Sequence, residues 1–336
     1  MKSESLSDNG IMKKYIAIFI LLFITKLILA QDPQFTQFYA SPLYLSPSFA
    51  GSTKGKRIVS NYRDQWPALK KSFVTYAFSY DHYLPSLNSG LGVQFLREQA
   101  GSGALSTTNA GLVYSYHIEL NHTWRFIPGI HFMYTQRGLQ FHKLTFGDQL
   151  VGDYESTVEV APQERAWDVD ATASGLVFSD RLWFGVTVDH LLQPNRSLTG
   201  DKSIVPVRYS LFGGMRIPIQ QKYNRQPFES LFPSFHFIKQ GKNAQMNVGL
   251  YWHNQPFLLG LWYRGLPVFK KYPSNDALAV MVGYKIDQFN IGYSYDITIS
   301  QLAGLTQGAH EISLIFKFGE YLKPREKWMV NPCPGL

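Results

Sequence analysis

The stretch Phe73-Val74-Thr75-Tyr76-Ala77-Phe78-Ser79-Tyr80-Asp81 alternates between two kinds of side chain. One set comprises Val74, Tyr76, Phe78 and Tyr80, and the other comprises Thr75, Ala77, Ser79 and Asp81. Because successive side chains of a β-strand point to opposite faces, this stretch predicts a strand with one apolar face and one polar face. A strand of this kind suits a barrel wall that separates lipid from a wet lumen.

The same period of two recurs outward along the chain in segments of about ten residues, separated by turn residues. It is clearest in residues 124–135 and 289–298. We therefore predict an all-β fold, an antiparallel transmembrane β-barrel of about fourteen strands. The predicted strands are residues 56–66, 73–81, 90–98, 105–118, 124–135, 167–179, 181–191, 207–219, 230–239, 243–253, 257–265, 276–287, 289–298 and 309–318.

Connection lengths give an independent argument, because outer-membrane barrels place short turns at the periplasmic side and long loops outside. Connections after even-numbered strands are mostly short, whereas those after odd-numbered strands include residues 138–166, 192–206 and 266–275. The longish even connection 220–229 is an exception, so a count of twelve or sixteen strands stays open.

Composition agrees with a barrel. The chain has 336 residues, of which 45% are hydrophobic and only 17% charged, so disorder is excluded. Aromatic residues reach 15%, as interfacial girdles require. A mean hydropathy of -0.14 argues against a bundle of membrane helices. The net charge of +8, which becomes +6 once residues 1–30 are removed, favours contact with anionic outer-membrane lipid or lipopolysaccharide over nucleic acid, because no basic run is interleaved with aromatics.

The amino-terminal sequence predicts a secretory signal peptide. The apolar run Tyr15 to Ala30 follows Lys13-Lys14 and precedes Gln31-Asp32-Pro33, which predicts cleavage after Ala30. Met12 is the expected start. The predicted organisation is then a signal peptide over residues 1–30, an N-terminal arm over 31–53, the outer-membrane barrel over 54–318 and a short periplasmic tail over 319–336.

The arm is rich in aromatics and carries Pro33, Pro42 and Pro47. Proline disrupts a helix interior and a central strand, so we expect an extended backbone. The arm could plug the lumen, dock a partner or merely close the periplasmic opening. The partner-binding candidates, including one in the tail, are Phe35, Gln37, Phe38, Tyr39, Tyr44, Phe49 and Trp328.

Several charged or polar side chains fall on the polar face of their predicted strands. These lumen-facing candidates are Arg125, His131, Asp189, Arg208, Arg216, Asp296, Glu311 and Lys317. Charges inside a barrel must pair or meet water. A packed, salt-bridged interior is favoured over a polar conduit, because the aromatic arm itself needs a place to bury.

Three chemical alternatives carry less weight. Ser294, Asp296, Glu311 and Ser313 share the polar face, but His310 falls on the other face, so no catalytic triad is predicted. The acidic residues of 148–170 do not match a Ca²⁺ loop, and the histidines are scattered, so no metal or cofactor is expected. Cys333 is a lone thiol that could pair between molecules.

Particular residues also carry a family resemblance. The opening Gln31 to Gly51, with QDPQFTQFYASPLYLSPSFAG, resembles the start of the PorP/SprF family of the type IX secretion system. Residues 61–67 with 79–81 resemble its first hairpin, and residues 292–296 with 310–314 resemble its closing hairpin. The Cys-Pro pair at 333–334 resembles the family tail, although Gly335-Leu336 departs from the expected basic-aromatic ending.

The resemblance implies an outer-membrane barrel of Bacteroidota-type bacteria that serves secretion and gliding. Its partner would be a secreted surface protein, held by its C-terminal sorting domain, or periplasmic secretion components. The resulting prediction is a non-enzymatic protein with no small-molecule substrate. A channel for hydrophobic or small polar solutes is the alternative, and an outer-membrane lipid hydrolase is the third.

Overall fold

The computed structural model describes residues 32–69, 73–101, 105–151, 157–159, 163–220, 229–265, 277–299 and 306–319. The described residues from Gln34 onward belong to one compact unit. The predictions for the signal peptide, for Trp328 and for Cys333 lie outside the described residues.

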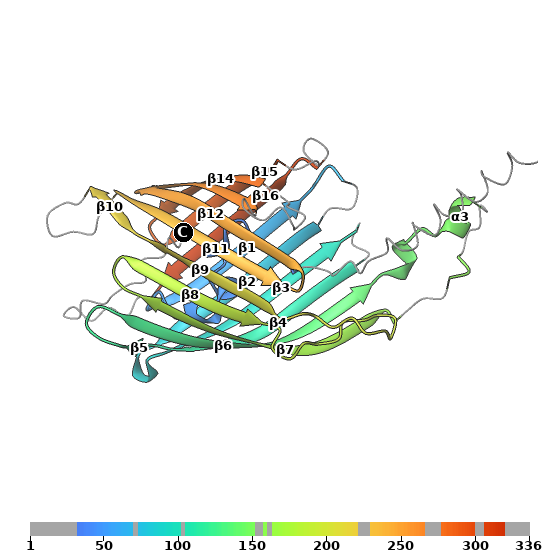
Figure 1. Cartoon of the computed structure of the whole chain (residues 1–336), viewed down its shortest axis with the longest axis horizontal. Coiled ribbons are helices and arrows are strands. Elements are labelled where there is room, and N and C mark those ends of the chain that lie inside the picture. Colours follow the sequence, from blue (N-terminus) through green and yellow to red (C-terminus); the bar gives the residue numbers. More distant parts are fainter. Residues whose placement is uncertain are drawn as a thin grey trace, which may run out of the picture. The chain divides into compact units, whose positions relative to one another are not determined.

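The described chain consists almost entirely of antiparallel strands (Figure 1). The strands are β1 (Lys56–Gln65), β2 (Phe73–Leu84), β3 (Ser89–Ala100), β4 (Leu105–Tyr116), β5 (Ile118–Glu119), β6 (Arg125–Leu139), β7 (Arg165–Phe178), β8 (Leu182–Asp189), β9 (Arg208–Met215), β10 (Ile217–Gln220), β11 (Glu229–Gln240), β12 (Asn243–Asn254), β13 (Phe257–Gly265), β14 (Ala277–Ile286), β15 (Phe289–Thr298) and β16 (Ala309–Phe318). The helical turns are η1 (Phe38–Ala40), α2 (Pro42–Leu45), η2 (Pro47–Phe49), η3 (Pro85–Leu87), η4 (Phe141–Lys143) and α3 (Gly147–Val151).

The strands close into a barrel because β1 pairs with both β2 and β16, with Lys56 opposite Phe318 and Gln65 opposite Ala309. The two-residue β5 only extends the β4–β6 pairing, and β10 continues β9 beyond Arg216. The remaining β-segments are the fourteen wall strands, and each coincides with a predicted strand. The prediction of an antiparallel fourteen-stranded barrel is confirmed.

Alternation along each strand separates the two faces of the wall. On β2, Tyr76 and Phe78 are 46% and 44% exposed on the outside, whereas Ala77 and Asp81 are buried inside. Large apolar side chains cover the outside of the other strands in the same way. Such a wall leaves no backbone edge unpaired and presents an apolar band to lipid, as an outer-membrane barrel requires.

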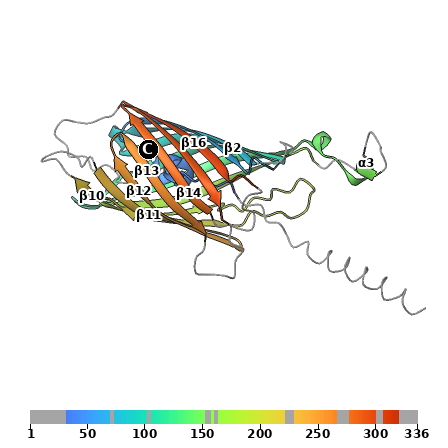
Figure 2. The same cartoon turned by 90° about the horizontal axis from the view of Figure 1, so that it is seen from above.

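The two open ends of the barrel differ. At one end, which we call the long-connection rim, the chain crosses between strands through residues 140–164, 190–207 and 266–276. The other end, the short-turn rim, has connections such as 179–181 and 287–288. The hairpin of β6 and β7 leads at the long-connection rim to α3, which lies beyond the barrel wall in both views (Figures 1 and 2). None of the helices in the described residues is long and apolar enough to cross a membrane.

Candidate functional site

Residues 34–53, which we call the plug, fill the lumen of the barrel. Their helical turns lie within the ring of strands in both views (Figures 1 and 2). Almost every side chain of the plug is buried, and Leu43, Leu45 and Phe49 are no more than 4% exposed. Burying one large apolar side chain contributes about 1.5–3 kcal/mol, so the plug and the wall stabilise each other.

The backbone of the plug is not extended as expected, but folds into η1, α2 and η2. The expectation was wrong because proline is tolerated at the first position of a helical turn, where no N–H partner is needed and its fixed φ suits the helix. Pro42 begins α2 and Pro47 begins η2, each in that position. Proline therefore starts these turns and limits their length.

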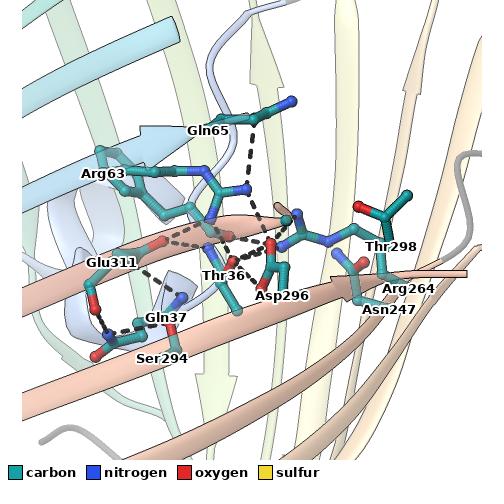
Figure 3. A network of polar contacts seen from close by, with 12 residues as sticks. Thr36, Gln37, Arg63, Gln65, Asn247, Arg264, Ser294, Asp296, Thr298 and Glu311 are labelled. Carbon is teal, nitrogen blue, oxygen red and sulfur yellow. Dashed lines mark hydrogen bonds and ion pairs between the residues drawn. The ribbon is translucent and has the colours of Figure 1, made fainter. Parts of the chain in front are cut away.

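Glu311 anchors the amino-terminal end of the plug at the long-connection rim (Figure 3). Its carboxylate accepts hydrogen bonds from the backbone N–H groups of Thr36 at 2.7 Å and Gln37 at 3.0 Å. The Gln37 side chain in turn donates to the Glu311 carbonyl at 3.0 Å and to Ser294 Oγ at 3.2 Å. The N–H groups of Thr36 and Gln37 have no partner in a helix or a sheet. The Glu311 carboxylate accepts their hydrogen bonds instead.

Two arginines and a second carboxylate complete this network (Figure 3). Asp296 accepts from Arg63 Nη2 at 2.9 Å, from Arg264 Nη1 at 3.1 Å and from Thr36 Oγ1 at 2.8 Å. Arg63 Nη1 also lies 3.2 Å from Glu311 Oε2. Two positive and two negative groups are thus paired. Arg63, Asp296 and Glu311 are almost completely buried and Arg264 is 13% exposed, and such pairing is the condition under which buried charge is tolerated. We call these four residues with Thr36 the rim network.

Aromatic side chains hold the middle of the plug. Phe38 packs edge-on against Trp262 with ring centres 4.8 Å apart, and Phe49 stacks on Phe212 at 5.7 Å. The Tyr39 hydroxyl accepts from Trp183 Nε1 at 3.1 Å and donates to the Gly213 carbonyl at 3.3 Å. Because these wall residues come from β8, β9 and β13, the plug ties distant parts of the barrel together.

A second polar cluster holds the carboxyl-terminal end of the plug at the short-turn rim. Asp81 accepts from the Gly51 N–H and from Arg57 Nε, both at 2.8 Å. Arg57 Nη2 donates to the Phe49 carbonyl at 2.9 Å, and Ser115 Oγ donates to the Ala50 carbonyl at 2.8 Å. The last turn before β1 is therefore fixed by side chains of β1, β2 and β4.

Lys54 and His117 lie beside this cluster, outside the strands. Lys54 Nζ donates to His117 Nδ1 at 3.0 Å, so His117 Nε2 carries the proton that it donates to the Ala50 carbonyl at 3.1 Å. Burial, and then the charge of Arg125, lower the pKa of Lys54 to about 7. Burial, and then the charge of Lys54, lower the pKa of His117 to about 3. The imidazole is therefore neutral near pH 7, as its two contacts require.

Close approach of plug and wall requires glycine at two positions. A Cβ at Gly129 on β6 would lie 2.5 Å from the Ser48 backbone nitrogen, and a Cβ at Gly90 on β3 would lie 2.2 Å from the Ala50 carbonyl oxygen. Any side chain at either position would push the plug backbone away from the wall.

A further set of polar side-chain contacts joins the connection 190–207 to the inside of the wall. Arg196 Nε lies 3.1 Å from Asp168 Oδ2, and His190 Nδ1 lies 2.6 Å from Asp170 Oδ2. Nearby, Arg208 Nε lies 2.9 Å from Asp189 Oδ2. The first two contacts hold Arg196 and His190 of this connection against inward-facing side chains of β7.

The structure places the residues singled out from sequence as follows. The side chains of Phe35, Gln37, Phe38, Tyr39 and Phe49 are buried in the plug, and Tyr44 is half-buried; all contact the barrel's own residues. Asp296 and Glu311 meet in the rim network, whereas Asp189 and Arg208 pair with each other on neighbouring strands. His131 is buried, Arg125 pairs with Glu119 near the short-turn rim, and Arg216 and Lys317 are half-buried.

Sequence reasoning missed several residues of these clusters. Arg63 and Arg264 in the rim network, and Arg57 near the short-turn rim, were not among the candidates. Arg57 and Arg63 share a period-two face with the buried Asn61, so the same alternation could have found them. Arg264 shares its face with Leu258, Gly260 and Trp262, which gives no polar signal. Thr36 carries no signal of this kind, because its role depends on where the plug lies.

Among the described residues, the side chains considered for catalysis or metal binding do not come together in one site. His310 lies on the outer face of the wall, where its Nδ1 is 2.8 Å from the Tyr293 hydroxyl. Asp296 and Glu311 face inward and form ion pairs within the rim network. Asp148, in the acidic connection, accepts from the Val158 N–H and from Thr157 Oγ1. In the described ranges no cluster of three histidine, cysteine or acidic residues could hold a metal ion.

Comparison with solved structures returns outer-membrane proteins. The toluene transporter TbuX of Ralstonia pickettii is 9% identical with a TM-score of 0.48, over 83% of this chain and 93% of that one. Omp33 of Acinetobacter baumannii is 8% identical with a TM-score of 0.41, over 78% and 98%. The KdgM porin is 10% identical with a TM-score of 0.36, over 78% and 99%.

No curated protein matches the sequence. A family model does match, over residues 28–316, and it describes a type IX secretion system membrane protein, PorP/SprF. The match covers the plug and nearly all of the barrel.

Proposed function

Because the chain belongs to the PorP/SprF family of type IX secretion system membrane proteins, we propose that this outer-membrane barrel acts by binding. Its partner is a secreted surface protein, held or escorted by its C-terminal sorting domain, and the mechanism involves no catalysis. Periplasmic secretion components are a second contact, through the segment 319–336, which lies largely outside the described residues.

The observation that carries this proposal is the filled lumen. Plug residues are hydrogen-bonded at both rims and packed between β8, β9 and β13 in the middle. A partner protein therefore binds at the rims of the barrel and not inside its lumen. The same observation weighs against the alternative of a solute channel, which needs an open polar path.

The connection 140–164 supplies a suitable docking surface. Leu150 and Val158 are 75% and 83% exposed there, beyond the barrel wall. Removing these two apolar side chains from water in a complex would favour association with a partner. The apolar outside of the wall faces lipid instead.

The test is affinity purification of the tagged protein from its native outer membrane in mild detergent, followed by mass spectrometry. We expect one large secreted protein, or periplasmic secretion components, to stay bound. Recovery of the barrel alone would contradict the proposal and would make conductance in liposomes the next measurement.

Paired variants localise the contact. Leu150→Glu with Val158→Glu should reduce recovery of the secreted protein, because charge on the docking surface opposes apolar burial. Leu87→Glu is the matched control, since Leu87 is 61% exposed in η3 at the short-turn rim. Equal recovery from both variants would remove the connection 140–164 from the proposal.

A further inference from the structure

The plug runs through the lumen in one direction. Thr36 contacts Arg63, Asp296 and Glu311, which lie within three residues of the ends of their strands at the long-connection rim. Ala50 contacts Ser115 and His117 at the short-turn rim, where β1 begins at Lys56. The chain therefore travels from the long-connection rim to the short-turn rim before it enters the wall.

Long connections of outer-membrane barrels face the outside of the cell, and short turns face the periplasm. Gln34, the first residue of the plug, thus lies at the end of the barrel that faces outward. The last wall strand, β16, ends at Phe318 on the opposite, periplasmic rim.

We propose that the chain ahead of the plug leaves the barrel on the outer side, so that the mature amino terminus is presented at the cell surface. With cleavage after Ala30, three residues precede Gln34 and span about 11 Å when fully extended. The apolar band of such a barrel is about 25 Å tall, so these residues cannot return to the periplasm through the lumen.

A consequence concerns assembly. The plug passes between wall strands that close only when β1 pairs with β16, and it contacts both of them through Asn61 and Glu311. The amino terminus therefore enters the lumen before or during barrel closure.

The test is thiol labelling of intact cells in a Cys333→Ser background. Gly-Cys-Gly is inserted between Pro33 and Gln34, which lengthens the chain only ahead of the plug. The probe is a maleimide coupled to a polyethylene glycol too large to cross the outer membrane, and labelling is read as a gel shift. Lys202→Cys, exposed in the connection 190–207, and His122→Cys, exposed at the short-turn rim, are the matched controls.

We expect the insertion variant to shift fully in intact cells, as Lys202→Cys does, while His122→Cys shifts only after the membrane is permeabilised. An insertion variant that behaves like His122→Cys would overturn the proposal. Gln34→Cys, which keeps the chain length, repeats the measurement if the insertion impairs assembly. Labelling depends on no partner, so its outcome is independent of the proposed binding function.

Discussion

The carboxylate of Glu311, on the last strand, accepts a hydrogen bond from the backbone N–H of Thr36 at 2.7 Å across 275 residues of sequence. Through this bond β16, which closes the barrel against β1, holds the amino-terminal end of the plug. The barrel wall and the plug therefore form one cooperative structure. Substitutions at the contacts between them should lower the stability of both.

Glu311→Gln tests the anchor of the plug. The amide keeps the size of the side chain but loses the charge that pairs with Arg63. Breaking a buried ion pair costs about 3–5 kcal/mol, and we expect about 3 because Asp296 still pairs with Arg63. The measurement is the free energy of unfolding in detergent, followed by heat-modified gel migration and circular dichroism.

Glu119→Gln is the control for that change. Glu119 pairs with Arg125, but its side chain is 65% exposed. An exposed pair contributes about 1 kcal/mol or less. A loss of stability for Glu311→Gln no larger than for Glu119→Gln would mean that the plug anchor is not important for stability.

Gly129→Ala tests the close approach of the plug to the wall. The new Cβ would lie 2.5 Å from the Ser48 nitrogen and 2.6 Å from the Pro47 carbonyl carbon, so the plug backbone must move. Overpacking of this kind costs about 1–3 kcal/mol. Gly147→Ala is the control, because nothing lies within 4 Å of its Cβ position. Equal unfolding midpoints for the two variants would show that the plug backbone does not lie against Gly129.

Deletion of residues 34–49 tests whether the plug blocks the lumen. The wild-type barrel should show little conductance in a planar lipid bilayer, whereas the deletion variant should conduct ions through the polar lumen that remains. Currents of equal size from both proteins would show that the plug is not the barrier. The rim-network variant Glu311→Gln should give intermediate, flickering currents, because only one end of the plug is released.

His117 and Lys54 both predict that stability rises with pH, each in its own pH window. The His117 pKa is lowered to about 3, so between pH 6.5 and 3 the unfolded chain binds a proton that the folded protein does not. Stability should therefore fall as pH falls through that window. The Lys54 pKa is lowered to about 7, so stability should rise between pH 7 and 10.5, as the unfolded lysine loses its charge.

The measurement is the unfolding midpoint in detergent at a series of pH values. His117→Asn should flatten the acid part of the curve, and Lys54→Met should flatten the alkaline part. The difference from wild type isolates each residue from the other titrating groups. Curves that stay parallel to wild type would rule out the Lys54–His117 contact as a source of pH dependence.

The sequence predicts the strands of the wall well, but it does not predict the conformation of the plug. Alternation such as that around Tyr76 and Asp81 located each wall strand, because a half-buried strand repeats every two residues wherever it occurs. The inward placement of Asp296 and Glu311 follows from the same rule. Local proline chemistry was not sufficient for the plug, since Pro42 fits both an extended chain and the start of a helical turn.

The sequence by itself thus determined an exported, lipid-facing barrel and the side chains on each face of its strands, because those properties depend on neighbouring residues. Only the tertiary structure decided that residues 34–53 fill the lumen and that Thr36, Arg63 and Glu311 meet there. That meeting depends on strand register and on closure of β1 against β16, pairings that join residues about 250 positions apart. No local pattern contains that information.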